Sequence, residues 1–76
     1  MVRFGMSNPN ETIKADMMDL FAKTETLTPG AAFMIAQRHF PSAASILAAR
    51  AIRELLAEGA IKEDTDPRNA GSYVAA

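Results

Sequence analysis

The chain has 76 residues, of which 49% are hydrophobic and 22% are charged, and its formal net charge is −1. This composition predicts one small soluble domain with a single modest core, and it excludes a deep catalytic cleft. The sequence contains no cysteine, which excludes disulfides and thiolate metal sites, and its near-neutral charge means that any nucleic-acid role depends on where the basic residues lie.

The N-terminal segment, residues 1–7, lacks the apolar run of a signal peptide. No later segment approaches the roughly 18 consecutive apolar residues that a membrane span needs. Val2 stands where the N-myristoylation motif has glycine. We therefore expect a cytoplasmic protein without membrane contact, in which residues 1–7 can become ordered on binding and residues 8–76 form the folded domain.

A first helix is predicted to begin at Asn8, which can cap it, with Pro9 in the first turn and Glu11 three residues after the cap. It is expected to end near Lys23. An apolar stripe at helical spacing marks the buried side, and most charged residues fall off this stripe. The stripe comprises Ile13, Met17, Leu20 and Phe21, and the charged residues off it are Lys14, Asp16, Asp19 and Lys23.

Residues 24–27 form a connector that could include a very short strand. Thr28 followed by Pro29 then predicts the start of a second helix that runs to about His39. Its buried side is expected to comprise Ala32, Ile35, Ala36 and either Phe33 or Phe40, with Gln37 and Arg38 pointing outward. Pro41 predicts that this helix stops at Phe40, and Ser42 is expected to cap the next one.

A third helix is predicted over residues 43–58, which are dominated by alanine, leucine, arginine and glutamate, with Gly59 at the position of a left-handed C-terminal cap. At 100° per residue, one face carries Ala48, Ala51, Ile52 and Leu55, and the opposite face carries Ile46, Arg50, Arg53 and Ala57. Residues 60–62 and 72–75 are strand candidates separated by a turn-rich stretch, which predicts a hairpin with a long loop.

This order of elements predicts a mainly α-helical fold with a small β-hairpin, namely a winged helix-turn-helix of three helices and a C-terminal wing. The same order of helices and strands also fits a plain three-helix bundle with a capping hairpin. Winged helices serve both as nucleic-acid-binding domains and as protein-interaction modules, so the fold by itself leaves the function open.

The basic residues of the predicted second and third helices and of the hairpin are expected to share one surface. The candidate RNA-binding residues are Arg38, His39, Arg50, Arg53, Lys62 and Arg68. A guanidinium can hold a phosphate with two parallel hydrogen bonds, so a few arginines can position a nucleic-acid backbone. Two features oppose this interpretation: Arg50 can pair with Glu54 one turn on, and the loop carries acidic residues at positions 63, 64 and 66 that a phosphate backbone would repel.

The sequence offers no set of residues for catalysis or metal binding. His39 is the only histidine, and without cysteine it cannot belong to a zinc site of ordinary spacing. Neither a nucleophile elbow nor a glycine-rich phosphate loop is present. We therefore predict no enzymatic activity, no cofactor, no metal and no small-molecule substrate.

Several segments resemble the eukaryotic-type small-subunit ribosomal protein twenty-five family. They are Leu27-Thr28-Pro29, the long helix over residues 45–56, Gly59-Ala60-Ile61-Lys62 and Tyr73, which together cover roughly residues 27–74. The resemblance implies a non-catalytic winged helix in the head of the small ribosomal subunit, bound to small-subunit ribosomal RNA and to neighbouring ribosomal proteins. Arg50, Arg53 and Lys62 match basic or polar positions of the family.

This chain departs from that family in three places. Family members usually carry a lysine-rich N-terminal tail and a basic wing, whereas this chain has a nearly neutral start and an acidic wing loop, and it has extra residues around positions 35–42. The resulting prediction is a structural constituent of the small subunit that binds ribosomal RNA through phosphate and shape contacts. The alternatives are a winged-helix DNA-binding regulator, which would need a dimer to reach two half-sites, and a protein-interaction module that uses exposed Ile46 or Phe40.

Overall fold

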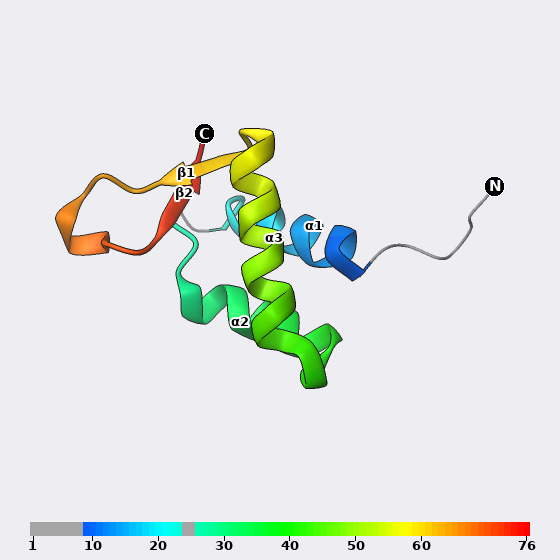
Figure 1. Cartoon of the computed structure of the whole chain (residues 1–76). Coiled ribbons are helices and arrows are strands. Elements are labelled where there is room, and N and C mark those ends of the chain that lie inside the picture. Colours follow the sequence, from blue (N-terminus) through cyan, green and yellow to red (C-terminus); the bar gives the residue numbers. More distant parts are fainter. Residues whose placement is uncertain (1–8, 24–25) are drawn as a thin grey trace.

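The computed structural model describes residues 9–23 and 26–76. Its elements are, in chain order, α1 (Pro9–Leu20), α2 (Pro29–His39), the 3₁₀ turn η1 (Pro41–Ala43), α3 (Ala44–Glu58), β1 (Ile61–Glu63), the 3₁₀ turn η2 (Pro67–Asn69) and β2 (Tyr73–Ala75). The long helix α3 packs against both α1 and α2, and the β1–β2 hairpin projects to one side (Figure 1). Three helices followed by an antiparallel hairpin confirm the predicted winged helix-turn-helix arrangement.

The predicted first and second helices form with small differences at their ends. α1 stops at Leu20 and not near Lys23, because the next three residues close a turn with i→i−3 bonds, such as Lys23 N–H to Leu20 O at 2.9 Å. The predicted cap Asn8 lies outside the described residues. α2 begins as predicted: Thr28 Oγ1 accepts from Ala31 N–H at 3.1 Å.

The turn between α2 and α3 differs from the prediction. Ser42 does not cap α3, because a 3₁₀ turn intervenes in which Ala43 N–H donates to Phe40 O at 3.1 Å. α3 therefore starts one residue later than predicted, with Ala43 in the capping position and no side-chain hydrogen bond there. Its other end is as predicted, since Gly59 adopts φ 77° and its N–H donates to the carbonyls of Leu55 and Leu56.

The core lies where the three helices and the start of the wing meet. Its buried apolar side chains are Ile13, Met17, Leu27, Ala32, Ile35, Ala36, Ala44, Ala48, Ala51, Leu55 and Ile61. The predicted inner faces of α2 and α3 are thereby confirmed except for Ile52, which is only half-buried against this core. Phe40 packs against this core, whereas Phe33 is 37% exposed. Of the two phenylalanines considered for the buried side of the second helix, Phe40 is therefore the one that contacts the core. Phe40 is therefore not the freely exposed residue that the interaction-module alternative invoked.

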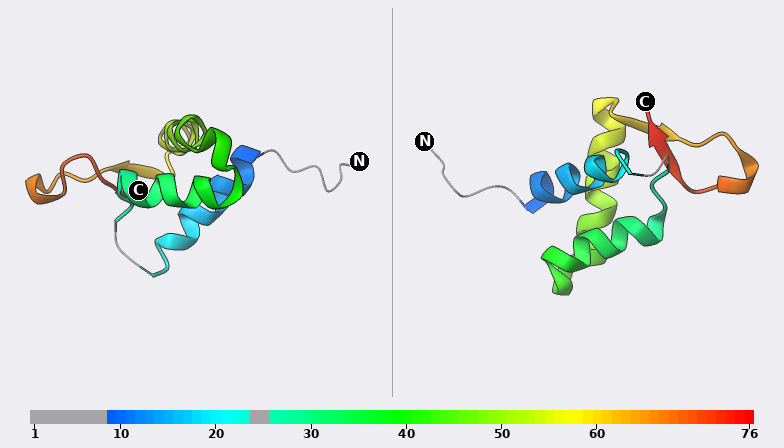
Figure 2. Two further views of the ribbon diagram at one scale, coloured as in Figure 1. Left: turned by 90° about the horizontal axis from the view of Figure 1, so that it is seen from below. Right: turned by 180° about the vertical axis from the view of Figure 1, so that it is seen from behind.

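The wing is a two-stranded antiparallel hairpin with Ile61 opposite Ala75 and Glu63 opposite Tyr73. A bridge ties the segment before α2 to it: Leu27 N–H donates to Tyr73 O at 2.8 Å, and Tyr73 N–H donates to Leu27 O at 2.9 Å. The expected short strand is thus reduced to this one bridge within the described residues. The bridge holds the first residue of β2, and the loop that precedes it reaches away from the helices (Figures 1 and 2).

Candidate nucleic-acid interface

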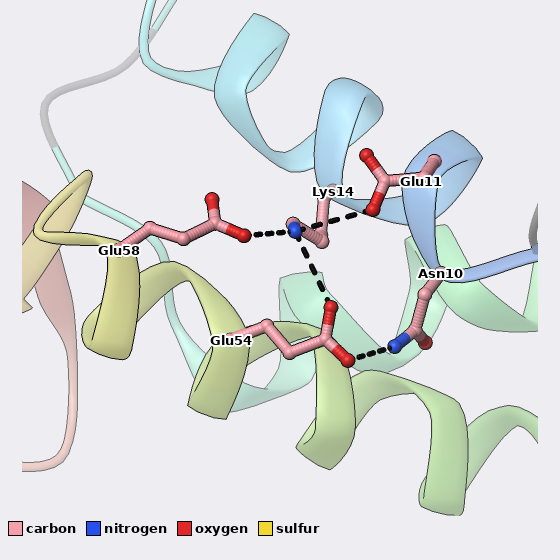
Figure 3. A network of polar contacts seen from close by, with 5 residues as sticks. All are labelled: Asn10, Glu11, Lys14, Glu54 and Glu58. Carbon is pink, nitrogen blue, oxygen red and sulfur yellow. Dashed lines mark hydrogen bonds and ion pairs between the residues drawn. The ribbon is translucent and has the colours of Figure 1, made fainter.

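The charged side chains of helix α3 differ in their partners. Arg50 and Arg53, one turn apart, are exposed on the outward face, as predicted. Both glutamates of α3 turn instead toward α1, where they bind Lys14 (Figure 3). Glu54 is therefore occupied elsewhere, and within the described residues it makes no ion pair with Arg50. Arg50 and Arg53 are thus exposed without an ion pair to a carboxylate of their own helix, while Glu54 and Glu58 bind Lys14 and remain 40% and 51% exposed.

The cation that draws these glutamates is buried. Lys14 has a side chain only 8% exposed, and its ammonium binds three carboxylates: Glu11 at 3.4 Å, Glu54 at 3.3 Å and Glu58 (Figure 3). Asn10 Nδ2 adds a hydrogen bond to the other oxygen of Glu54 at 2.6 Å. The hydrogen bond to Glu58, helped by those to Glu54 and Glu11, raises the pKa of Lys14 well above its usual range despite the opposing desolvation. All three ammonium donors have acceptors.

Lys14 lies off the apolar stripe, as predicted, but the expectation that this stripe marks the whole buried side of α1 is wrong. Ile13 and Lys14 are adjacent in sequence and both are buried, because the side of α1 that faces α3 is wider than the apolar stripe. The sequence contains one feature that indicates carboxylate partners for a cation at this position. Glu54 and Glu58 are four residues apart on α3, a spacing that places two carboxylates on one face, where they can share a single cation.

Arg38 and His39 lie beside α1 and not beside the α3 arginines. His39 Nε2 contacts Asp16 Oδ2 at 2.5 Å, and both side chains are about one-third exposed. Arg38 lines a shallow hollow between α1 and α2 together with Asp16, Asp19 and Lys23. The expected single surface is therefore not assembled. These two residues belong to a mixed-charge seam of α1 and α2, whereas Arg53 lines a hollow formed by α2, α3 and β2.

The two wing residues of the predicted set are exposed but differ in their surroundings. Lys62 lies in β1 opposite Val74. Arg68, in η2 on the projecting loop, is held by Asp66: its Nη2 and Nε donate to the carboxylate at 2.8 and 3.2 Å, and its backbone N–H donates at 3.0 Å. The guanidinium, followed by the backbone N–H, lowers the pKa of Asp66. The positive charge of Arg68 is thus compensated within the loop.

Two of the acidic residues, Asp64 and Asp66, stabilise the loop's own conformation. Asp64 accepts from the backbone N–H of Asp66 at 2.9 Å and from Asn69 Nδ2 at 3.1 Å. Such local bonds stabilise turns in which short acidic side chains replace backbone partners. The loop is therefore internally bonded, and its charges compensate each other in part.

The described residues contain no cluster of three or more histidine, cysteine, aspartate or glutamate side chains arranged to hold a metal ion. No helix in residues 9–23 and 26–76 combines the length and the hydropathy of a membrane-crossing segment.

Four of the predicted cations, Arg38, Arg50, Arg53 and Lys62, thus make no ion pair with a carboxylate in the described part of the chain, and the last three of them lie on α3 and the wing. Comparison with protein-family models, curated proteins and solved structures finds no match to this chain, so the resemblance to the ribosomal family stays a prediction.

Proposed function

We propose that this chain is a non-catalytic nucleic-acid-binding domain that docks the outward face of α3 in the major groove of duplex DNA. The observation that carries the proposal is the sorting of charges on α3, with Arg50 and Arg53 outward and both glutamates bound to Lys14. A helix binds phosphates more favourably when its carboxylates are neutralised by other groups of the chain, because like charges repel. The arrangement meets this condition although the whole chain carries a net charge of −1.

The shape of α3 favours B-form DNA over duplex RNA. The outward face of α3 carries Ile46 and Ala57 beside the two arginines. The major groove of B-form DNA is wide enough to admit an α-helix, and arginine there can bind phosphates or the O6 and N7 atoms of guanine. The major groove of A-form RNA is too narrow for a helix.

Ribosomal RNA is the second candidate, and the resemblance over residues 27–74 supports it. In this proposal Arg50, Arg53 and Lys62 bind the backbone of small-subunit ribosomal RNA in the head of the subunit, with neighbouring ribosomal proteins as further partners. We rank DNA first because the narrow major groove of duplex RNA does not admit a helix such as α3.

Fluorescence anisotropy with the purified full chain tests the proposal, using a B-form DNA duplex and an RNA duplex of the same sequence at several salt concentrations. The double variant Arg50→Ala with Arg53→Ala is expected to weaken DNA binding. It should also make the slope of log K against log salt about 1.8 shallower, because each phosphate contact on B-form DNA contributes about 0.9. Arg38→Ala is the matched control, since it removes an exposed arginine from the α1–α2 seam, and its slope should stay near that of the original chain.

Equal slopes for the double variant and the original chain would contradict the assigned surface. Tighter binding to the RNA duplex, again dependent on Arg50 and Arg53, would favour the ribosomal candidate. In that case the double variant should also fail to join small subunits that the original chain enters. Circular dichroism shows whether the variants keep their helices, which we expect because both arginines are exposed.

A gain of affinity is expected from a change in the wing. Asp66→Asn keeps an oxygen that can accept from the backbone N–H of Arg68 but removes the charge that holds its guanidinium. The freed guanidinium can reach a phosphate, so the salt slope should steepen by up to about 0.9. Glu63→Gln removes the same charge from the wing without freeing an arginine, and its smaller effect serves as the control. If both variants raise the affinity equally, only net charge matters and Arg68 makes no contact.

A further inference from the structure

A continuous apolar groove runs along the seam of α2 and α3 as far as β2. It consists of two adjoining hollows that share Pro29, Ala49 and Ile52. The hollow nearer the α2–α3 turn adds Phe33, and the hollow nearer the wing adds Leu56 and Tyr73. Among residues 9–23 and 26–76, Arg53, at the wing end, is the only charged residue that lines either hollow.

The floor of this groove leaves large apolar side chains in contact with water. Phe33 and Leu56 are 37% and 36% exposed, and Ile52 between them is half-buried. Burying such carbon surface is favourable at about 25 cal/mol per Å². A phosphate backbone does not provide the apolar groups that would cover it. The groove therefore fits a protein partner better than it fits a nucleic acid.

The single charge on the rim specifies that partner further. Among the described residues no carboxylate pairs with Arg53, because the acidic residues of α3 are bound to Lys14 on another face. An acidic side chain on the partner would complement Arg53. A second copy of this chain that presented the same groove would place no carboxylate opposite Arg53, because no acidic residue of the described part of the chain lines either hollow.

We propose that this groove docks an amphipathic helix of a partner protein, with apolar side chains on Phe33, Ile52 and Leu56 and an acidic side chain on Arg53. Helices seat in such grooves through residues at i, i+3, i+4 and i+7. A partner helix of about 15 residues would match the length of α3, roughly 22 Å at 1.5 Å per residue. The inference does not depend on DNA binding, since the groove can be probed without nucleic acid.

The test is a displayed library of helical peptides of about 16 residues, with leucine, isoleucine or phenylalanine at the four anchor positions and randomised polar positions. It is selected against the full chain without nucleic acid. We expect the selected peptides to be enriched in aspartate or glutamate at a position that faces Arg53. Ala49→Glu, which places a charge in the apolar floor, should weaken their binding by at least about tenfold.

Arg53→Glu should weaken the binding of these acidic peptides to a similar extent, and Arg50→Glu is its matched control. Both variants make the same charge change on α3, but Arg50 lines neither hollow. Failure to enrich any peptide, or equal losses in the two arginine variants, would overturn the proposal. Sedimentation that shows a dimer dissociated by Ala49→Glu would also overturn it, because the occupant would then be a second copy. The proposal would also be overturned if a DNA duplex covered the groove and the selected peptides failed to displace that duplex.

Discussion

Replacing Leu55 with alanine is expected to destabilise the domain by about 2–5 kcal/mol. Leu55 is 2% exposed on the inner face of α3, where it packs in the core shared with α1 and α2. Its neighbours on that face, Ala48 and Ala51, are too short to fill the cavity. Because a domain of 76 residues has a total stability of about 4–11 kcal/mol, the loss is a large part of it.

Urea unfolding followed by circular dichroism measures this loss as a lower midpoint with an unchanged slope. Leu56→Ala is the matched control, because it makes the same change one residue along the same helix at a side chain that is 36% exposed. It should cost less than about 1 kcal/mol. Similar losses at the two positions would mean that α3 does not present the inner face described above.

The inner and outer faces of α3 were predictable because the pattern is local. Ala48, Ala51 and Leu55 recur at helical spacing, and Gly59 marks the end where a left-handed residue is required. The hairpin was predictable for a similar reason, since turn-forming residues separate two short β-prone segments. In both cases the signal and the structure that it specifies lie within a few residues of each other.

The positions of the charges were less predictable, because they depend on contacts between helices. Lys14 looks like a surface residue of its own helix, and two of its partners lie 40 and 44 residues away in sequence. Likewise, the pattern of α2 shows that Arg38 points outward, but not that it points toward the carboxylates of α1. A helical wheel describes one helix, whereas the sharing of a surface depends on how the helices pack.

The stability of the domain should depend more on the glutamates that bind Lys14 than on Lys14 itself. The double variant Glu54→Gln with Glu58→Gln is expected to lower the free energy of unfolding more than Lys14→Met does. In the first case a buried ammonium keeps only Glu11 as a charged partner, whereas in the second the remaining carboxylates are 40% and 51% exposed and can be hydrated. Methionine also fills the space with an apolar chain of similar length.

Measuring the free energy of unfolding at alkaline pH separates the contribution of the Lys14 charge from the contributions of the other residues. Because its pKa in the folded protein lies above the ordinary value of 10.5, its stabilising effect is complete below about pH 10 and is lost as the pH rises through the folded value. The difference in unfolding free energy between the original chain and Lys14→Met should therefore be constant from pH 7 to about pH 10 and shrink above pH 10.5. All other titratable groups are common to both proteins and cancel in the difference. A difference that grows above pH 10.5, or a Lys14→Met variant less stable than the double glutamine variant, would contradict the assignment of Lys14 as a buried ammonium held by carboxylates of α3.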